Sequence, residues 1–133
     1  MVTNAAGRKP HAGSYYAWLG GYGTSHTDSL SQSVTVPVDA QTVTLTFWLS
    51  VATAETTSTD RYDEMNLEIQ DASGAILQGV VTYSNLDATA GYEKRTFVLT
   101  HFKGQTIVLA FTAIEDSSLE TSWLLDDLTI TVD

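Results

Sequence analysis

Four carboxylates could do chemistry because of their spacing from apolar residues in strand-like segments. Each acid lies an even number of residues from a run of alternating apolar side chains. Because side chains two residues apart in a β-strand lie on one face, these acids are predicted to face the core. A carboxylate there must be paired, hydrogen-bonded or metal-bound, since an unpaired buried charge is costly. The four acids are Glu55, Asp63, Glu115 and Asp126.

Oxygen ligands that converge at one rim of a β-structure suit Ca²⁺, which binds about six to eight oxygens. Asp116 and Asp127 are sequence neighbours of two of the four acids and complete the predicted ligand set. The alternative is that the acids accept hydrogen bonds from backbone N–H groups of adjacent loops. A β-bulge would also break the parity on which the prediction rests. The sequence therefore predicts a structural Ca²⁺ and leaves loop anchoring open as the alternative.

Aromatic side chains form a second candidate site. The parity that places apolar residues inward places Trp18, Trp48 and Trp123 on the opposite faces of their strands. Tyr22 lies in the glycine-rich stretch Gly20–Gly23. Aromatic faces stack on the apolar faces of sugars, so these four residues are predicted ligand contacts for a carbohydrate or another polymer. Structural packing under loops or at sheet edges is the alternative.

No motif for catalysis is present, and no catalytic residue is predicted. The three histidines (His11, His26 and His101) are scattered, without metal-ligand spacing. The nucleophile-elbow pattern G-x-S-x-G is absent, and Gly20–Gly23 lacks the lysine of a phosphate-binding loop. A stand-alone hydrolase, with a site assembled from distant strands, is therefore the least favoured function.

The elements that must position these residues are β-strands. Short alternating segments rich in Thr, Val, Tyr and Ile are separated by Gly, Asp, Asn and Ser, and no window has a helical stripe. We therefore expect an all-β, antiparallel β-sandwich of jelly-roll type with about eight strands, forming a single domain over 1–133. Residues 1–13 are expected to be an irregular start. The expected strands are 14–19, 29–36, 42–52, 63–71, 75–83, 94–100, 105–114 and 121–132.

Composition excludes several classes of partner. The 133 residues carry a net charge of −10, which argues against nucleic acid and against anionic membranes as partners. No apolar run approaches the length of a membrane span, and no signal peptide is recognisable in residues 1–30. Cysteine is absent, which excludes disulfides and thiol chemistry, and Thr and Ser together make up 32 residues. This composition favours a secreted β-rich domain.

Several segments together resemble a known type of accessory domain. They are His11–Gly23 (HAGSYYAWLGGYG), Leu30–Val34 (LSQSV), Phe47–Leu49 (FWL), Ala54–Thr57 (AETT), Tyr62–Asp63 (YD), Gly104–Thr106 (GQT), Glu115–Ser118 (EDSS) and Leu125–Asp127 (LDD). They resemble a β-sandwich domain toward the C-terminus of secreted bacterial peptidases and other hydrolases, and more distantly the jelly-roll modules of the MAM and carbohydrate-binding kind. The resemblance spans about residues 11–132.

The resemblance implies a non-catalytic accessory module of a secreted hydrolase, with polysaccharide or a protein polymer and the parent catalytic domain as partners. It also implies that Asp126 is a Ca²⁺ ligand, since an acid in the late strand helps to bind Ca²⁺ in related modules. A purely structural spacer without a ligand is the alternative function. Relatives usually have a segment like NPGFE before the Gly-Ser-Tyr strand, and its absence here leads us to expect a chain shortened at its first strand.

Overall fold

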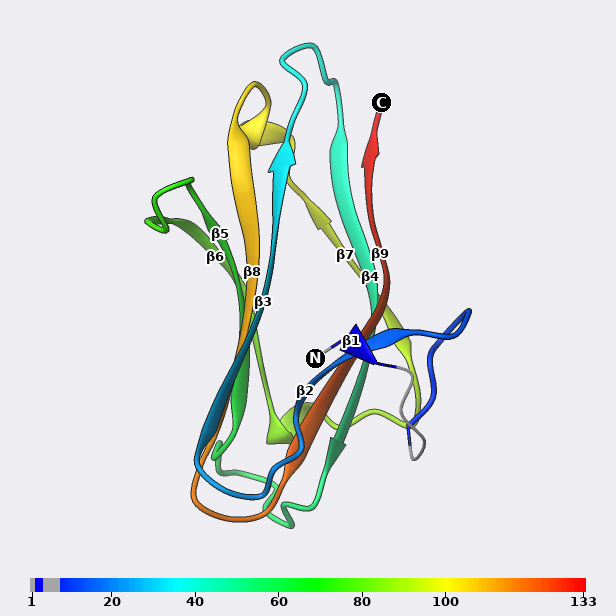
Figure 1. The fold of residues 1–133 in the computed structure, drawn as a ribbon, viewed down its shortest axis with the longest axis vertical. Coiled ribbons are helices and arrows are strands. Elements are labelled where there is room, and N and C mark those ends of the chain that lie inside the picture. The colour runs from blue at the N-terminus through cyan, green and yellow to red at the C-terminus, as the bar shows by residue number, and fades with distance from the viewer. Residues whose placement is uncertain (1, 4–7) are drawn as a thin grey trace.

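Two antiparallel β-sheets pack face to face in the computed structural model, which describes residues 2–3 and 8–133 (Figure 1). The five-stranded sheet has the order β1 (Val2–Thr3), β2 (Tyr16–Gly20), β9 (Thr121–Val132), β4 (Val43–Thr53), β7 (Glu93–Val98). The four-stranded sheet has the order β3 (His26–Thr35), β8 (Thr106–Glu115), β5 (Glu64–Gln70), β6 (Ile76–Ser84). Two short 3₁₀ helices, η1 (Asn85–Asp87) and η2 (Thr100–Phe102), lie in connections.

The prediction of an all-β antiparallel sandwich is confirmed. Each of the eight expected strands is present, with ends shifted by up to three residues. A ninth strand, β1, pairs through only two residues with β2. Part of the expected irregular start is therefore a short edge strand, while residues 8–15 carry no regular structure and residues 4–7 lie outside the described part of the chain.

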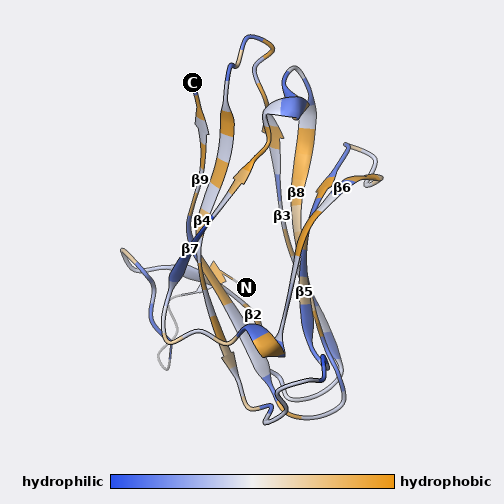
Figure 2. Cartoon of the chain, turned by 180° about the vertical axis from the view of Figure 1, so that it is seen from behind, coloured by the Kyte–Doolittle hydropathy of each residue, from blue (hydrophilic) through white to orange (hydrophobic). Residues whose placement is uncertain are grey.

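The core lies between the sheets and follows from period-two alternation. In β4 and β5 alternate side chains are buried and half-buried along almost the whole strand. Phe47 of β4 meets Phe111 of β8 edge to face, with ring centroids 5.4 Å apart. Figure 2 shows the hydrophobic residues distributed along strands of both sheets, where they can pack against each other.

A bulge in β9 reverses the predicted parity of its first half. Trp48 pairs with Asp126 and Thr46 pairs with Thr129, so two residues of β9 lie opposite the single residue Phe47, one more than regular pairing allows. Asp127, with φ of 49°, provides the local kink. The predicted core-facing position of Asp126 is therefore wrong, because the inward face before the bulge carries Trp123 and Leu125 instead.

The connections β2–β3, β4–β5 and β8–β9 gather at one end of the sandwich, the lower end in Figure 1. This loop end receives the residues that follow β4 and β8 and those that precede β5. Residues 8–15, which precede β2, instead lie on the outer side of the five-stranded sheet. No helix among the described residues is long and apolar enough to cross a membrane.

Candidate functional site

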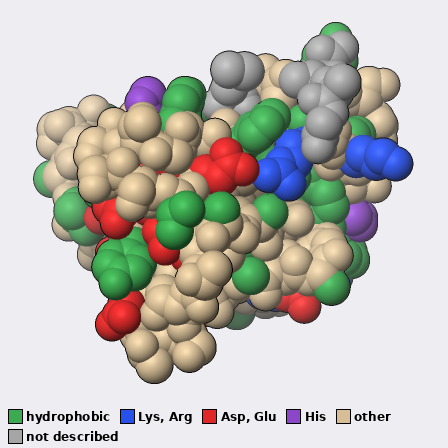
Figure 3. Space-filling view, turned by 90° about the horizontal axis from the view of Figure 1, so that it is seen from below, with side chains coloured by type: hydrophobic (Ala, Val, Ile, Leu, Met, Phe, Trp, Pro, Cys, Tyr) green, Lys and Arg blue, Asp and Glu red, His purple; other side chains and the backbone are tan. Residues whose placement is uncertain are grey.

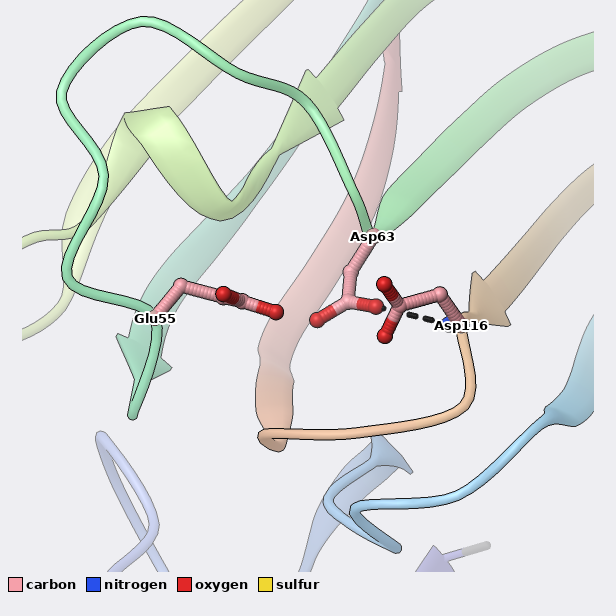
Figure 4. A group of neighbouring side chains, drawn as sticks. All are labelled: Glu55, Asp63 and Asp116. Carbon is pink, nitrogen blue, oxygen red and sulfur yellow. Dashed lines mark hydrogen bonds between the residues drawn. The ribbon is translucent and has the colours of Figure 1, made fainter.

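Three carboxylates meet at the loop end. Glu55 follows β4, Asp63 immediately precedes β5, and Asp116 immediately follows β8. One oxygen of each lies within 4.8 Å of the others. Figure 4 shows the three side chains pointing toward one another from their separate strands. We call Glu55, Asp63 and Asp116 the acidic triad.

Asp63 is the buried member of the acidic triad, with no exposed surface. Its Oδ1 accepts a hydrogen bond from the backbone N–H of Asp116 at 2.8 Å, and its Oδ2 accepts one from the Thr121 hydroxyl at 2.6 Å. Both bonds satisfy the carboxylate, as a buried acid requires. The predicted core-facing parity of Asp63 is thus seen in the structure, and the loop-anchoring role accounts for part of its environment.

Glu55 is held near two other negative charges. Its pKa is raised above the usual value by desolvation and then by the charges of Asp63 and Asp116. Among the described residues, no Lys or Arg forms an ion pair with the acidic triad. The carboxylates therefore repel one another, and a bound cation would relieve that repulsion.

Glu115 lies next to the acidic triad in the chain but has different partners. Its Oε1 accepts the N–H of Tyr22 at 3.0 Å, and its Oε2 accepts those of Gly23 and Thr121, both at 3.3 Å. The side chain is buried, with 3% of its surface exposed. Glu115 therefore fastens the glycine-rich β2–β3 loop to the start of β9, which is the anchoring alternative left open by the sequence.

Two members of the acidic triad line a hollow of about 450 Å³. Glu55 and Asp116 line it together with hydroxyl side chains of Thr56, Thr57 and Ser118. Two exposed apolar side chains, Tyr62 and Leu119, stand at the same hollow. Figure 3, which views the molecule from this end, shows acidic side chains interspersed with hydrophobic ones.

A second group of predicted residues lies on the outer face of the five-stranded sheet. Trp18 on β2 and Trp48 on β4 are both half-buried and alternate with core residues, so they project away from the core. Their strands lie on either side of β9, where Trp18 pairs with Leu124 and Trp48 pairs with Asp126. Two strand spacings across the sheet and two residues along β9 put the two Cα atoms roughly 12 Å apart. The prediction that these two tryptophans lie on the face of their strands opposite the core is correct.

The outer face also buries side chains of its own. Tyr16 and Leu124 are buried, with 2% and 4% of their surface exposed, yet neither belongs to the cluster between the sheets.

Charged residues flank Trp48 on the outer face. Asp126 of β9 pairs with Trp48 on one side, and Lys94 of β7 pairs with it on the other. An aromatic surface bordered by charged groups thus covers the middle of this sheet.

Asp126 and Asp127 lie outside the acidic triad. Asp126 Oδ2 accepts the backbone N–H groups of His11 and Ala12, and Asp127 Oδ2 is 2.6 Å from His11 Nδ1. The structure therefore separates the six acids of the predicted ligand set into three groups, of which only Glu55, Asp63 and Asp116 have converging oxygens.

The two other predicted aromatic ligand contacts, Trp123 and Tyr22, lie in different environments. Trp123 has no exposed surface and belongs to the core, so its predicted outward position is wrong. Tyr22 is 48% exposed and packs on His26 at the loop end, with ring centroids 3.7 Å apart. Tyr22 is thus accessible, but it lies in the β2–β3 connection at the loop end and not on a strand of the outer face.

Sequence reasoning missed His11 and Tyr92 as members of the outer-face group. The His11 ring stacks on Trp48, with centroids 4.0 Å apart and planes at 15°. Tyr92 lies edge-on to His11 at 5.5 Å. His11 precedes every expected strand and Tyr92 lies in a connection, so no strand parity could have placed them.

Comparison with known proteins gives structural matches without sequence relatives. No protein-family model and no curated protein matches the sequence. The structure of TmCBM61 in complex with β-1,4-galactotriose matches with a TM-score of 0.59 and 17% identity, over 92% of this chain and 74% of that chain. The enzymatically active domain of bacteriophage CBA120 tailspike protein 4 matches with a TM-score of 0.60 and 9% identity, over 99% of this chain and 17% of that chain. A family 16 carbohydrate binding module-2 matches with a TM-score of 0.48 and 16% identity, over 91% of this chain and 79% of that chain.

These identities support a statement about fold. The chain has a β-sandwich fold that is also found in a carbohydrate-binding module.

Proposed function

We propose that this chain is a non-catalytic accessory module that binds carbohydrate through the outer face of its five-stranded sheet. The observation that carries the proposal is the pair of half-buried tryptophans, Trp18 and Trp48, which project from that face. Aromatic rings on a solvent-facing sheet provide the flat apolar surface on which a sugar ring stacks. Asp126 and Lys94, which flank Trp48 in the sheet, supply groups for sugar hydroxyls.

The fold supports the proposal, because the similar TmCBM61 structure is described in complex with β-1,4-galactotriose. The resemblance to accessory domains of secreted bacterial hydrolases extends it to an extracellular protein in which this module accompanies a catalytic domain. The abundance of Thr and Ser, with an acidic net charge and no cysteine, is compatible with that setting. That the accompanying catalytic domain is a hydrolase, such as a peptidase, is part of the proposal.

Affinity electrophoresis against soluble galactan, xylan and hydroxyethyl cellulose, with β-1,4-galactotriose as competitor, tests the binding site. We expect retardation on at least one polymer, and its loss in Trp48→Ala. Tyr22→Ala is the matched control, since it removes an exposed aromatic ring at the loop end. If only Tyr22→Ala abolishes retardation, the proposed face is wrong. If the native protein is retarded by no polymer, the purely structural spacer takes the place of the binding module.

We also propose that the acidic triad holds a structural Ca²⁺. Three carboxylates with converging oxygens, and hydroxyl groups lining the adjacent hollow, form the hard oxygen environment that Ca²⁺ prefers. The raised pKa of Glu55 supports this, because its second cause is repulsion from the neighbouring carboxylates. The ion would tie the ends of β4, β5 and β8 together.

Thermal unfolding with and without a chelator tests the Ca²⁺ site. At a free Ca²⁺ concentration of about 100 times Kd, binding stabilises the folded state by about 2.7 kcal/mol. That stabilisation corresponds to a rise in Tm of roughly 10 °C in a domain of this size. Asp116→Asn should remove the rise, whereas Asp39→Asn should keep it, because Asp39 is an exposed acid in the β3–β4 connection at the opposite end of the sandwich (Figure 1). Equal Tm values for chelated and Ca²⁺-loaded native protein would refute the site.

A further inference from the structure

One short segment before β2 lies against both tryptophans of the outer face. The Arg8 guanidinium is 5.6 Å from the Trp18 ring centroid. Three residues later the His11 ring stacks on Trp48 at 4.0 Å. We call Arg8–Ala12 the covering segment. Its two aromatic contacts fall on the same side chains that the proposed carbohydrate site uses.

Hydrogen bonds fix the covering segment to the polar groups of the same face. The backbone N–H groups of His11 and Ala12 donate to Asp126 Oδ2 at 2.8 and 3.1 Å. The Tyr92 hydroxyl donates to the Lys9 carbonyl at 2.7 Å. Asp126 is therefore engaged by the chain itself, in the manner in which a sugar hydroxyl would engage it.

The covering segment is held by contacts at the surface of the protein. His11 and Ala12 are exposed, and Arg8 is half-buried. The His11–Asp127 contact joins side chains that are 30% and 38% exposed, so water can replace either partner. Such peripheral segments open with small free energies while the core stays folded.

We propose that the covering segment is a built-in competitor of carbohydrate, so that docking of Arg8–Ala12 and stacking of a sugar on Trp48 exclude each other. This inference rests on the proposed function. A ring 4.0 Å from Trp48 and nearly parallel to it occupies the position that a stacked sugar ring would take. The apparent association constant for saccharide is then the intrinsic constant multiplied by the fraction of molecules in which the segment is displaced.

Two measurements on the full chain test the competition separately from carbohydrate binding itself. The first is acrylamide quenching of Trp48 fluorescence, isolated as the difference between proteins with and without Trp48→Phe. His11→Ala should increase this quenching. His101→Ala is the matched control, because His101 is also exposed and its ring lies against an aromatic ring, that of Phe102, at a tilt of 39° in another part of the fold.

The second measurement is affinity for the polysaccharides of the binding panel. We expect His11→Ala to bind roughly three- to tenfold more tightly than the native chain, with His101→Ala unchanged. Because coupling is reciprocal, saturating polysaccharide should also increase the rate at which trypsin cleaves after Arg8 in the native chain.

The outcomes separate the two proposals. Increased quenching together with tighter binding supports the competition. Polysaccharide binding that is unchanged or weakened in His11→Ala overturns the competition alone, since His11 is then neutral or part of the binding surface. Absence of binding by both proteins overturns the proposed function and the competition with it, even if quenching shows that the segment has been displaced.

Discussion

Replacing Glu115 with Gln should lower the free energy of unfolding by about 2–4 kcal/mol. Glu115 is buried and accepts three backbone hydrogen bonds, at 3.0, 3.3 and 3.3 Å, from Tyr22, Gly23 and Thr121. A hydrogen bond to a charged partner contributes about 1.5–3 kcal/mol. The Gln amide keeps one oxygen, but its NH₂ group turns donors toward backbone donors, so at least one partner is left unsatisfied.

Urea unfolding in the presence of a chelator measures this loss without any contribution from Ca²⁺. In a domain of 133 residues the change corresponds to a fall in Tm of roughly 10 °C. The matched control is Glu120→Gln, the same chemical change at an exposed position just before β9. We expect the control to stay within about 0.5 kcal/mol of the native protein.

If Glu115→Gln and Glu120→Gln unfold with the same midpoint and slope, Glu115 does not anchor the β2–β3 loop as described. The same conclusion follows if Glu115→Gln loses stability only when Ca²⁺ is present, because Glu115 would then act as a metal ligand. A change in slope alone would report a change in the denatured or native ensemble rather than the lost hydrogen bonds.

Three other changes give results of distinct sign. Glu55→Gln should leave the metal-free protein equally or more stable at neutral pH. The pKa of Glu55 is raised in the folded state, so the stability that its neutral form contributes is lost as pH rises through the folded-state pKa, and Gln stays neutral. The same variant should show no stabilisation by Ca²⁺ in thermal melts. Burial, and then Asp126 and other groups, raise the pKa of Tyr92 to about 12, so Tyr92 should not contribute to the phenolate absorbance that grows near pH 10. The stability contributed by the protonated Tyr92 hydroxyl is complete below the pKa of unfolded tyrosine, near 10, and is lost as pH approaches 12. Gly20→Ala should destabilise by about 2 kcal/mol or more in urea unfolding, since φ is +77° and the new Cβ would lie 2.3 Å from the Thr121 carbonyl oxygen, whereas Gly79→Ala meets open space and should be nearly neutral.

The fold was predictable because the two sheets each bury one face. Segments such as 42–52 and 63–71 alternate strictly, and the structure buries the predicted side of both. Strand β1 was not predicted, because two paired residues leave no periodic pattern. Period-two alternation therefore gives the strands and the buried face wherever a strand is regular over several residues.

The site was predictable only up to the first irregularity. Asp63 and Glu115 were correctly placed inward, as they are buried at the ends of regular strands. Asp126 and Trp123 were misplaced, since Trp123, Leu124 and Leu125 are all apolar and the parity of β9 could be counted from either side of the Asp127 bulge. A run of adjacent apolar residues removes the information that alternation would otherwise supply.

The partners of the inward acids could not be derived from strand patterns, because they come from loops. The sequence left metal binding and loop anchoring as alternatives for one set of acids. The structure divides that set by geometry, giving Glu115 backbone donors and giving Glu55, Asp63 and Asp116 converging oxygens. Loop conformation decides this division, and loop conformation follows from turn residues and tertiary contacts rather than from periodicity.

Thr121 connects the two kinds of acid at the loop end. Its backbone N–H donates to Glu115, which holds the β2–β3 loop, and its hydroxyl donates to Asp63 of the acidic triad. Thr121 is itself fully buried, so it cannot exchange either partner for water without opening the structure. Loss of the Glu115 anchor therefore shifts the residue that also orients Asp63. The loop that carries Tyr22 and the acidic triad are thus linked through one residue, Thr121, and a cation bound at the triad would restrain both.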